Sequence, residues 1–529
     1  MPWWSSLSQS RIVTNIDPPM PYSNDPGLHL PFFRAPPSNV PPLRRLLLIS
    51  FHFPPSGATG ALRWQKLSRF AVQRGWALDV ISLHPSELDK VDDKRLADLP
   101  PETRVYGVPM PKLLLEQFEG QLWRWYRRLR PVKPAIADVP GPGRQARAGE
   151  HWGVMAPAAF RDRLLRRLKQ IVGITRRGYF AWMDYYTHGA WADEVTRLGL
   201  RLLEADKYEV IITCGPPHMA HEAGRRLAER TGLPLVVDLR DPWRLVQRLA
   251  DVFDSALWYR LAAFYERRVV ARASLIVMNT ARAQNAMQAV YPSKRSQIIA
   301  VMNGYDEEPS RPARVERKFI VAYAGAIYLD RDPTLLLEAL AQLVRSMDLT
   351  PSDIGLEFMG HVESHQNVSL HQLAEAAGIA DYVRILGPGS RDAALEFLSH
   401  ASILVSLPLF SGRSAGRKSA RPLQQDSDMA IPAKIFDYMQ FDAWILAIAQ
   451  RGSATDILLR DSGANIVAPD DLEGMTEALT SRFRQHRNGA RPVRLSASMP
   501  FTSRRVQAAL LLDAIDKVVR SERAARVRE

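Results

Sequence analysis

The stretch Leu46-Leu47-Leu48-Ile49-Ser50-Phe51 is a short apolar run with the length of a buried parallel strand. Residues 54–60, with the sequence PPSGATG, interrupt it, and a helical pattern then runs to Gly75. Residues 78–82 have the pattern of the next strand. The three segments predict one βαβ unit, and its first loop lies at the carboxyl end of a strand, where open α/β sheets bind ligands.

The same alternation of short apolar runs and helical patterns continues to residue 306 and begins again at residue 319. We therefore expect two Rossmann-like domains, at 43–310 and 311–490. The first domain carries a basic amphipathic insertion at 111–180, and the second a turn-rich mobile loop at 411–428. The predicted ends of the chain are a disordered proline-rich lead at 1–42 and a C-terminal segment, 491–529, whose helix returns to the first domain.

Positive charge is concentrated in one part of this 529-residue chain, whose formal net charge is +14. Between Arg124 and Arg177, 14 Lys or Arg stand against 3 acidic residues, and the rest is nearly balanced. Such a segment suits an anionic membrane surface or a phosphorylated lipid, while nothing in it resembles a nucleic-acid module. Two amphipathic stretches lie in this region, at 114–129 and 164–172. The alternative is that both cover the sheet and expose solvated arginines.

Composition indicates a soluble enzyme of a reducing compartment. The single cysteine, Cys214, excludes an internal disulfide and follows an apolar run, so we expect it to be packed in a core. No apolar run of the roughly 18 residues needed for a membrane span is found, and the N-terminus lacks a secretory pattern. We therefore expect a cytoplasmic location, at the inner face of the cytoplasmic membrane if the basic segment binds lipid.

The sequence IPAKIFDYM at 431–439 combines features of an anion site. Pro432 suits the first position of a helix, whose free N–H groups and dipole favour a phosphate. Lys434 adds a cation, and Asp437 offers an acceptor for sugar hydroxyls. The alternative is a solvated surface pair on a helix packed by its apolar residues.

Polar residues also follow the predicted strands of the first domain. His52 and Arg63 flank the first loop as ligand contacts or rim residues, and Gly57 and Gly60 would let a ligand approach the backbone. Two later strand ends carry the sequences GPPH at 215–218 and RDPW at 240–243. For Asp241 the alternative to a ligand contact is the capping of loop N–H groups.

Five segments in this order resemble glycosyltransferase family 4, of the type that builds bacterial surface polysaccharides. They are residues 53–64, 238–243, 303–306, 323–340 and 431–438. The resemblance implies an α/β chain with the GT-B fold, in which two Rossmann-like domains with parallel sheets face a central cleft. It also implies a retaining transferase that uses no metal and no separate cofactor, because its substrate is a nucleotide sugar such as a UDP- or GDP-sugar.

The resemblance assigns roles to individual residues. Asp241 is the first candidate, and His218 the second, for the contact or base at the acceptor hydroxyl. The donor-binding residues would be Gly325, Arg331, Gly387, Gly389, Ser390, Lys434 and Asp437, and the acceptor loop would contain His52, Gly57, Gly60 and Arg63. Arg331 would meet the diphosphate and Asp437 the ribose.

One position departs from the family pattern, because Met429 stands where the first glutamate of the E-x7-E motif belongs. We expect a lipid-linked or polysaccharide acceptor. Two alternatives stay open: a non-catalytic sugar-binding or scaffold protein of a polysaccharide assembly complex, which Met429 favours, and an epimerase of the same fold.

Overall fold

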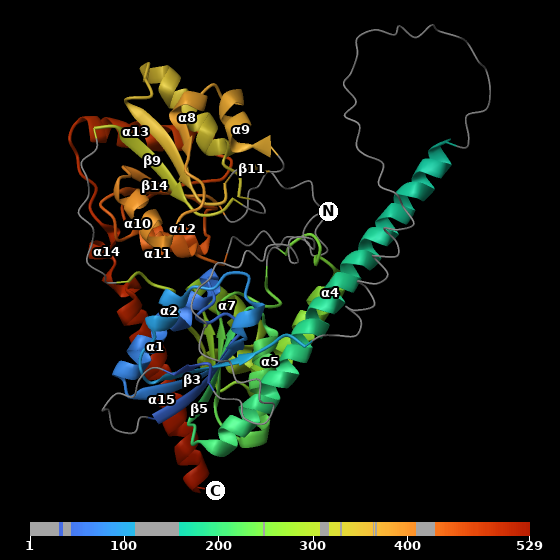
Figure 1. Ribbon diagram of the computed structural model, residues 1–529. Helices are drawn as coiled ribbons and strands as arrows, with labels where there is room; N and C mark the ends of the chain where they lie inside the picture. The colour runs from blue at the N-terminus through green and yellow to red at the C-terminus, as the bar shows by residue number, and fades with distance from the viewer. Residues whose placement is uncertain are drawn as a thin grey trace, which may run out of the picture.

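The computed structural model describes residues 31–34, 44–111, 158–246, 249–306, 317–327, 331–362, 364–365, 368–408 and 429–528. For residues 158–172 and 364–365 it describes the backbone alone. The predicted mobile loop at 411–428 lies outside these residues, as do most of the predicted lead and of the basic segment 124–177. In Figure 1 the described chain forms two α/β domains, one coloured blue to green and the other yellow to orange.

The first domain is built on an eight-stranded sheet in the order β1-β4-β3-β2-β5-β6-β7-β8. All neighbouring strands are parallel except β1, which runs antiparallel to β4. The strands are β1 (Phe33–Arg34), β2 (Arg44–Ser50), β3 (Trp76–Leu83), β4 (Thr103–Val108), β5 (Val210–Gly215), β6 (Leu235–Leu239), β7 (Leu275–Met278) and β8 (Ile298–Ala300).

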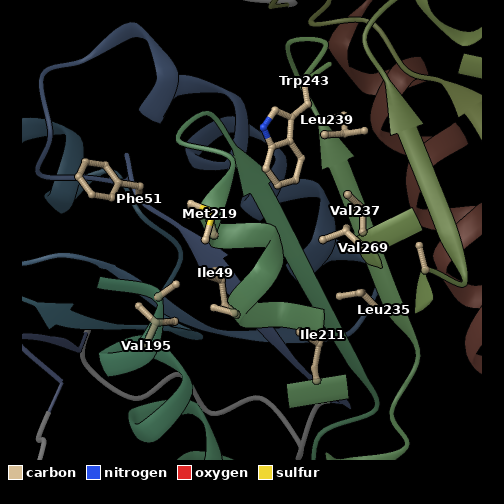
Figure 2. Packing of buried hydrophobic residues seen from close by; sticks show 14 of the residues in the cluster. Ile49, Phe51, Val195, Ile211, Met219, Leu235, Val237, Leu239, Trp243 and Val269 are labelled. Carbon is tan, nitrogen blue, oxygen red and sulfur yellow. The ribbon is translucent and has the colours of Figure 1, made fainter. Parts of the chain in front are cut away.

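Helices cover both faces of this sheet, so its strands are apolar on both sides. They are α1 (Leu62–Gln73), α2 (Asp93–Ala97), α4 (Ala158–Ala205), α5 (Met219–Thr231), α6 (Ala256–Arg272) and α7 (Ala281–Val290). Alternate residues of β2 enter opposite cores: Leu46 and Leu48 join the cluster with α1, while Leu47 and Ile49 join the cluster with α4, α5 and α6. Figure 2 shows the second cluster, with Ile49, Ile211 and Val237 of the sheet beside Met219 of α5.

Part of the predicted disordered lead is ordered. Residues 33–34 form β1, with Phe33 opposite Val105 and Arg34 opposite Arg104 of β4. The reason is that Phe32 and Phe33 pack against the apolar cluster on the α1 face of the sheet. The packing of these two aromatic side chains therefore adds an edge strand to the sheet, in a segment whose proline-rich composition predicted disorder.

The second domain contains a six-stranded parallel sheet in the order β13-β10-β9-β14-β15-β16. Its strands are β9 (Phe319–Ala324), β10 (Ile354–Met359), β13 (Val383–Ile385), β14 (Ile403–Ser406), β15 (Trp444–Ile448) and β16 (Asn465–Val467), and a small hairpin pairs β11 (Ser364–His365) with β12 (Val368–Ser369). The helices are α8 (Thr334–Met347), α9 (Leu370–Ala376), α10 (Arg391–Ser399), α11 (Ala433–Tyr438), α12 (Ala454–Leu459), α13 (Leu472–Arg487) and α14 (Leu495–Ser498). Together the two domains confirm the predicted fold class, which is α/β with two Rossmann-like units.

The last helix, α15 (Arg504–Arg528), runs back to the first domain and packs against α1 (Figure 1). Two contacts join the domains at loops that follow the carboxyl ends of strands. Lys94 Nζ of α2 lies 3.3 Å from Asp392 of α10, and the Thr280 hydroxyl donates a 2.6 Å hydrogen bond to the Met429 carbonyl. The carboxyl edges of the two sheets therefore face each other.

The long helix α4 runs beside the first domain in Figure 1 and contains the second of the two predicted amphipathic stretches. Among the described residues, no helix combines the length and the apolar character needed to cross a membrane.

Candidate functional site

The chain order of the second sheet reverses between β9 and β14, and open α/β sheets bind ligands at the carboxyl end of such a pair. Gly325 follows β9 at this point, with a φ of 135° that only glycine adopts readily. A Cβ atom there would lie 2.7 Å from Nζ of Lys434. The glycine thus makes room for the lysine at the carboxyl ends of β9 and β14, and we call this place the crevice, after the general ligand position in such sheets.

Backbone hydrogen bonds hold the neighbouring strand ends together around this glycine. The Gly325 N–H donates to the Met359 carbonyl, and the Gly360 N–H donates to the Gly387 carbonyl, each at 2.8 Å. A Cβ on Gly360 would lie 2.2 Å from the Gly325 oxygen, so the two backbones approach more closely than side chains would permit. The predicted donor-site residues Gly325 and Gly387 are therefore brought to one edge of the sheet.

Lys434 is buried in the crevice without a carboxylate in salt-bridge contact among the described residues. Its Nζ donates a 2.9 Å hydrogen bond to the Ala324 carbonyl and lies 3.7 Å from the centroid of the Tyr323 ring. Burial, and then the charge of Arg331, lower the pKa of Lys434 well below its usual range, while Asp437 acts in the opposite direction. An anion bound here would restore the charged form.

Two other predicted residues border the crevice. The Arg331 guanidinium donates to the Ala326 carbonyl at 3.2 Å and to the Tyr323 hydroxyl at 3.4 Å. Asp437 accepts from Arg391 at 3.2 Å, and both of these side chains are about one third exposed, with 30% and 39%. Arg391 was not predicted, yet it engages the carboxylate that the resemblance assigns to the ribose.

The helix that follows Pro432 is a weaker anion site than the sequence predicted. Pro432 is the N-cap with extended ψ, not the first helical residue, and α11 has only six residues. So short a helix supplies little dipole, and the positive charge at this place comes instead from Arg331 and, once an anion is bound, from Lys434. Ser390 caps α10 by accepting from the Ala393 N–H at 3.1 Å, which engages its oxygen as an acceptor and leaves its O–H able to donate. Gly389 lies beside it, with Met359 Sδ 3.5 Å from where its Cβ would be.

The first sheet reverses its order between β2 and β5, and three histidines gather at the carboxyl ends of these strands. His52 follows β2, while His218 and His221 lie at the start of α5, directly after β5. His218 stacks on Trp243, with ring centroids 5.0 Å apart. His221 Nδ1 lies 2.7 Å from the Thr213 hydroxyl. The cluster occupies the position in the first domain that Gly325 occupies in the second.

These imidazoles are neutral and keep unused ring nitrogens. Burial, followed by nearby positive groups such as Arg240, lowers the pKa of His52 to about 4. Burial also lowers the pKa of His221 to about 3 and that of His218 well below its ordinary value. His52 Nδ1, His218 Nδ1 and His221 Nε2 are buried without a hydrogen-bond partner among the described residues. Unpaired buried polar atoms of this kind point to a polar ligand.

Arg240 and the predicted Asp241 form the rim of the histidine cluster. The Arg240 guanidinium donates to the Gly60 carbonyl at 2.7 Å, and a Cβ on Gly60 would lie 2.5 Å from Nη1. Asp241 is 48% exposed, with its carboxylate 3.6 Å from Arg240 Nε. Gly57 is tied to the backbone of Lys90, whose carbonyl accepts its N–H at 2.9 Å.

Arg63 is neither a free ligand contact nor a rim residue. Its side chain is 3% exposed and binds Asp238 through two hydrogen bonds, at 2.8 and 3.0 Å. It also donates to the Val301 carbonyl at 3.1 Å. In sequence this arginine lies next to the loop. On α1, however, its side chain points toward the sheet, where it binds Asp238 near the end of β6.

The sequence analysis did not predict site roles for His221, Arg391 or the Tyr323 ring, which packs against Lys434. The spacing of His218 and His221, three residues apart at a predicted helix start, was a usable signal. Arg391 and Tyr323 gave no such signal, because their roles depend on which strands become neighbours. Among the described residues, no group of three or more His, Cys, Asp or Glu is placed to hold a metal ion.

No protein-family model matches the chain, and no curated protein matches it by sequence. Solved structures do resemble it. The apo form of the lipopolysaccharide outer core galactosyltransferase WaaB matches 89% of this chain over 99% of its own, at 9% identity and a TM-score of 0.50. A UDP-forming α,α-trehalose-phosphate synthase from Burkholderia xenovorans matches 90% over 99% of its own chain, at 13% identity and a TM-score of 0.51.

The N-terminal domain of Candida albicans trehalose-6-phosphate phosphatase matches 92% of the chain over 99% of its own, at 12% identity and a TM-score of 0.50. At such identities a likeness reports the fold alone. The two facing Rossmann-like domains and the returning C-terminal helix agree with it, and the chain has the GT-B fold.

Proposed function

We propose that the protein is a glycosyltransferase that moves a sugar from a nucleotide-sugar donor to an acceptor hydroxyl. The observation that carries this proposal is the cationic crevice of Lys434 and Arg331 at the reversal point of the second sheet. When the glycosidic bond of the donor breaks, the leaving nucleoside diphosphate gains negative charge. The Arg331 guanidinium is held in place beforehand to stabilise that charge, and the buried Lys434 amine joins it by taking up a proton when the anion binds.

The acceptor belongs to the facing edge of the first sheet. His52, His218 and His221 stay uncharged at neutral pH, and uncharged imidazoles suit a sugar hydroxyl better than a phosphate. Asp241 remains the first candidate for the group that receives the hydroxyl proton, because its carboxylate is accessible. His218 is second, since its strongly lowered pKa makes it a weak base. Retention of configuration and independence of metal belong to this proposal through the resemblance to family 4.

Isothermal titration calorimetry with UDP-, GDP- and dTDP-sugars tests the donor site. One preferred donor should bind wild-type protein, and Asp437→Ala and Arg331→Ala should each weaken binding about tenfold or more, as expected for loss of a charge-assisted contact. Arg451→Ala, an exposed arginine on a turn before α12, is the matched control. Equal donor affinity in wild type and all variants would show that the crevice is not the donor site.

The lowered pKa of Lys434 provides a second readout of the same site. A bound diphosphate should raise that pKa, so Lys434 should take up a proton from the buffer on binding. The measured enthalpy should then vary with the ionisation enthalpy of the buffer in wild type and not in Lys434→Gln. A buffer-independent enthalpy in wild type would contradict the role of this amine.

A lipid-linked acceptor at the membrane is the finer part of the proposal. The charge of segment 124–177 motivates it, and α4 adds exposed Ile174, Trp182 and Tyr186, at 52%, 39% and 40%. The rings of Trp182 and Tyr186 are stacked at 5.1 Å, and tryptophan and tyrosine suit the interface between lipid and water.

Sedimentation with anionic vesicles at low salt tests membrane binding. Trp182→Ala and a double substitution of Arg166 and Arg167 should each reduce it, whereas Val493→Ser, a 76% exposed apolar residue of the second domain, should not. Binding equal to that of neutral vesicles, with unchanged activity on a lipid-linked acceptor in the arginine variant, would refute this part.

A non-catalytic sugar-binding protein is the second candidate, and Met429 favours it. Its side chain packs against the apolar core of the first domain, and its carbonyl accepts from Thr280. The position that holds a glutamate in family 4 is therefore used here for a contact between domains. Donor binding without hydrolysis or transfer, even with lipid extracts present, would support this second candidate.

A further inference from the structure

A second cationic site lies where the chain crosses between the two domains. The outgoing segment near Tyr305 and the returning segment near Thr502 run side by side, because the Tyr305 N–H donates to the Thr502 carbonyl at 3.1 Å. The Arg504 N–H returns a bond to the Tyr305 carbonyl at 2.8 Å, and its guanidinium donates to the Gly304 carbonyl at 2.9 Å. Arg504 therefore holds the two segments that cross between the domains together, and we call this contact the clamp and the two segments the crossings.

A cavity of about 200 Å³ opens beside this clamp, several times the roughly 30 Å³ that one water occupies in the liquid. Its lining includes one face of α1, the end of the outgoing segment and the start of α15. Its charged residues, with the ring of one phenylalanine, are Lys66, Arg69, Phe70, Asp306, Arg504 and Arg505.

Positive charge exceeds negative charge by three in this lining. Lys66 Nζ and Arg504 Nε share the single carboxylate of Asp306, at 3.3 and 2.5 Å. Burial alone would raise the pKa of Asp306, but the two cations outweigh it, and the pKa is lowered. Arg69 and Arg505 are exposed at the mouth, and the Arg505 guanidinium lies 6.0 Å from the centroid of the Phe70 ring.

We infer that this cavity binds a dianion of the phosphate class. Guanidinium groups match the geometry of phosphate oxygens, and one such dianion would offset two of the three excess positive charges of the lining. The long helix α15 begins at Arg504, so its positive dipole end adds to the attraction. Because the same cations hold the crossings, a bound anion reduces their mutual repulsion and stabilises the clamp.

The test follows the thermal unfolding of the full chain with increasing inorganic phosphate, at an ionic strength held constant with chloride. Phosphate should raise the transition temperature of wild type, and sulfate should act similarly as a dianion. The double variant Arg69→Gln/Arg505→Gln should weaken the apparent affinity about tenfold or more, since it loses two charge-assisted contacts. Arg74→Gln, at the C-cap of the same helix and outside the lining, is the matched control.

The donor crevice also attracts phosphate, so Arg331→Ala separates the two sites. The phosphate effect should persist in Arg331→Ala, and its apparent affinity should fall about tenfold or more in the double variant. Three results would overturn the inference: no effect of phosphate beyond that of chloride in wild type, an undiminished effect in the double variant, or an effect abolished by Arg331→Ala.

Discussion

Replacing Arg63 with methionine should destabilise the first domain strongly, because it strands a buried charge. Asp238 is fully buried and receives two hydrogen bonds from Arg63, together with one from the Trp64 indole at 2.9 Å. In Arg63→Met the indole alone remains. Removing one partner of a buried ion pair costs about 3–5 kcal/mol, and the Val301 carbonyl loses its donor as well. We expect a loss near the upper end of that range.

Hydrogen exchange measured by mass spectrometry suits this test, because a chain of two domains does not unfold in one step. Peptides covering α1 and β6 should lose protection in Arg63→Met, while those of the second domain should not. Adding Asp238→Asn should restore much of the protection, since the stranded charge is gone. Arg74→Met, which removes an exposed pair with Asp513, should cost about 1 kcal/mol or less.

The reasoning is refuted if Arg63→Met exchanges like wild type, or if the double variant is less stable than Arg63→Met. The first result would mean that Arg63 is available to a ligand, as the sequence alone allowed. The second would mean that packing of the long side chain, and not charge, holds the end of β6.

Gly325→Ala should weaken donor binding about tenfold or more in the calorimetric assay, because its Cβ would lie 2.7 Å from Lys434 Nζ; unchanged affinity would contradict the crevice geometry. Glu266 has a pKa raised by burial from 4.5 to about 7, so its contribution to stability is full below about pH 4.5 and is lost as the pH rises through 7. Glu266→Gln should therefore gain up to about 3 kcal/mol relative to wild type between pH 5 and pH 8, as followed by hydrogen exchange in peptides covering α6, and a pH-independent difference would contradict this. Gly304→Ala should cost about 1–3 kcal/mol of exchange protection in peptides covering the start of α15, since φ is 71° and its Cβ would lie 2.8 Å from the Arg504 backbone; a cost near zero would show that the backbone at this contact relaxes.

The fold could be predicted from the sequence because its signals are local. The run at 46–51, the turn at 54–60 and the strand at 78–82 lie within a single βαβ unit, and the same pattern recurs along the chain. A tertiary contact outweighed the local composition at one place. The prolines before residue 43 predicted disorder, but Phe32 and Phe33 pack against an apolar surface of the sheet.

The candidate sites were only partly predictable because they depend on which strands become neighbours. Gly325 and Lys434 are more than a hundred residues apart, and a motif suggested each, but their contact follows from the strand order of the sheet. Arg63 is next to the loop in sequence, but its position could not show that its guanidinium would form an ion pair with Asp238, which lies on a strand far along the chain. Burial of this kind is a property of the assembled sheet.

The two reversal points of the sheets differ in charge, and on the proposed function this difference favours different ligands. In the second domain Lys434 and Arg331 lie together at the crevice, and Asp437, a carboxylate that acts on Lys434, is already engaged by Arg391. In the first domain the charge of Arg240 is offset by Asp241 at 3.6 Å, and the buried histidines stay neutral down to about pH 4. On the proposed function a diphosphate therefore gains more at the second site than at the first, while among the described residues a hydroxyl finds imidazole nitrogens without a hydrogen-bond partner at the first site. This asymmetry would let the facing edges of the two sheets hold a charged donor and a neutral acceptor group in a fixed order.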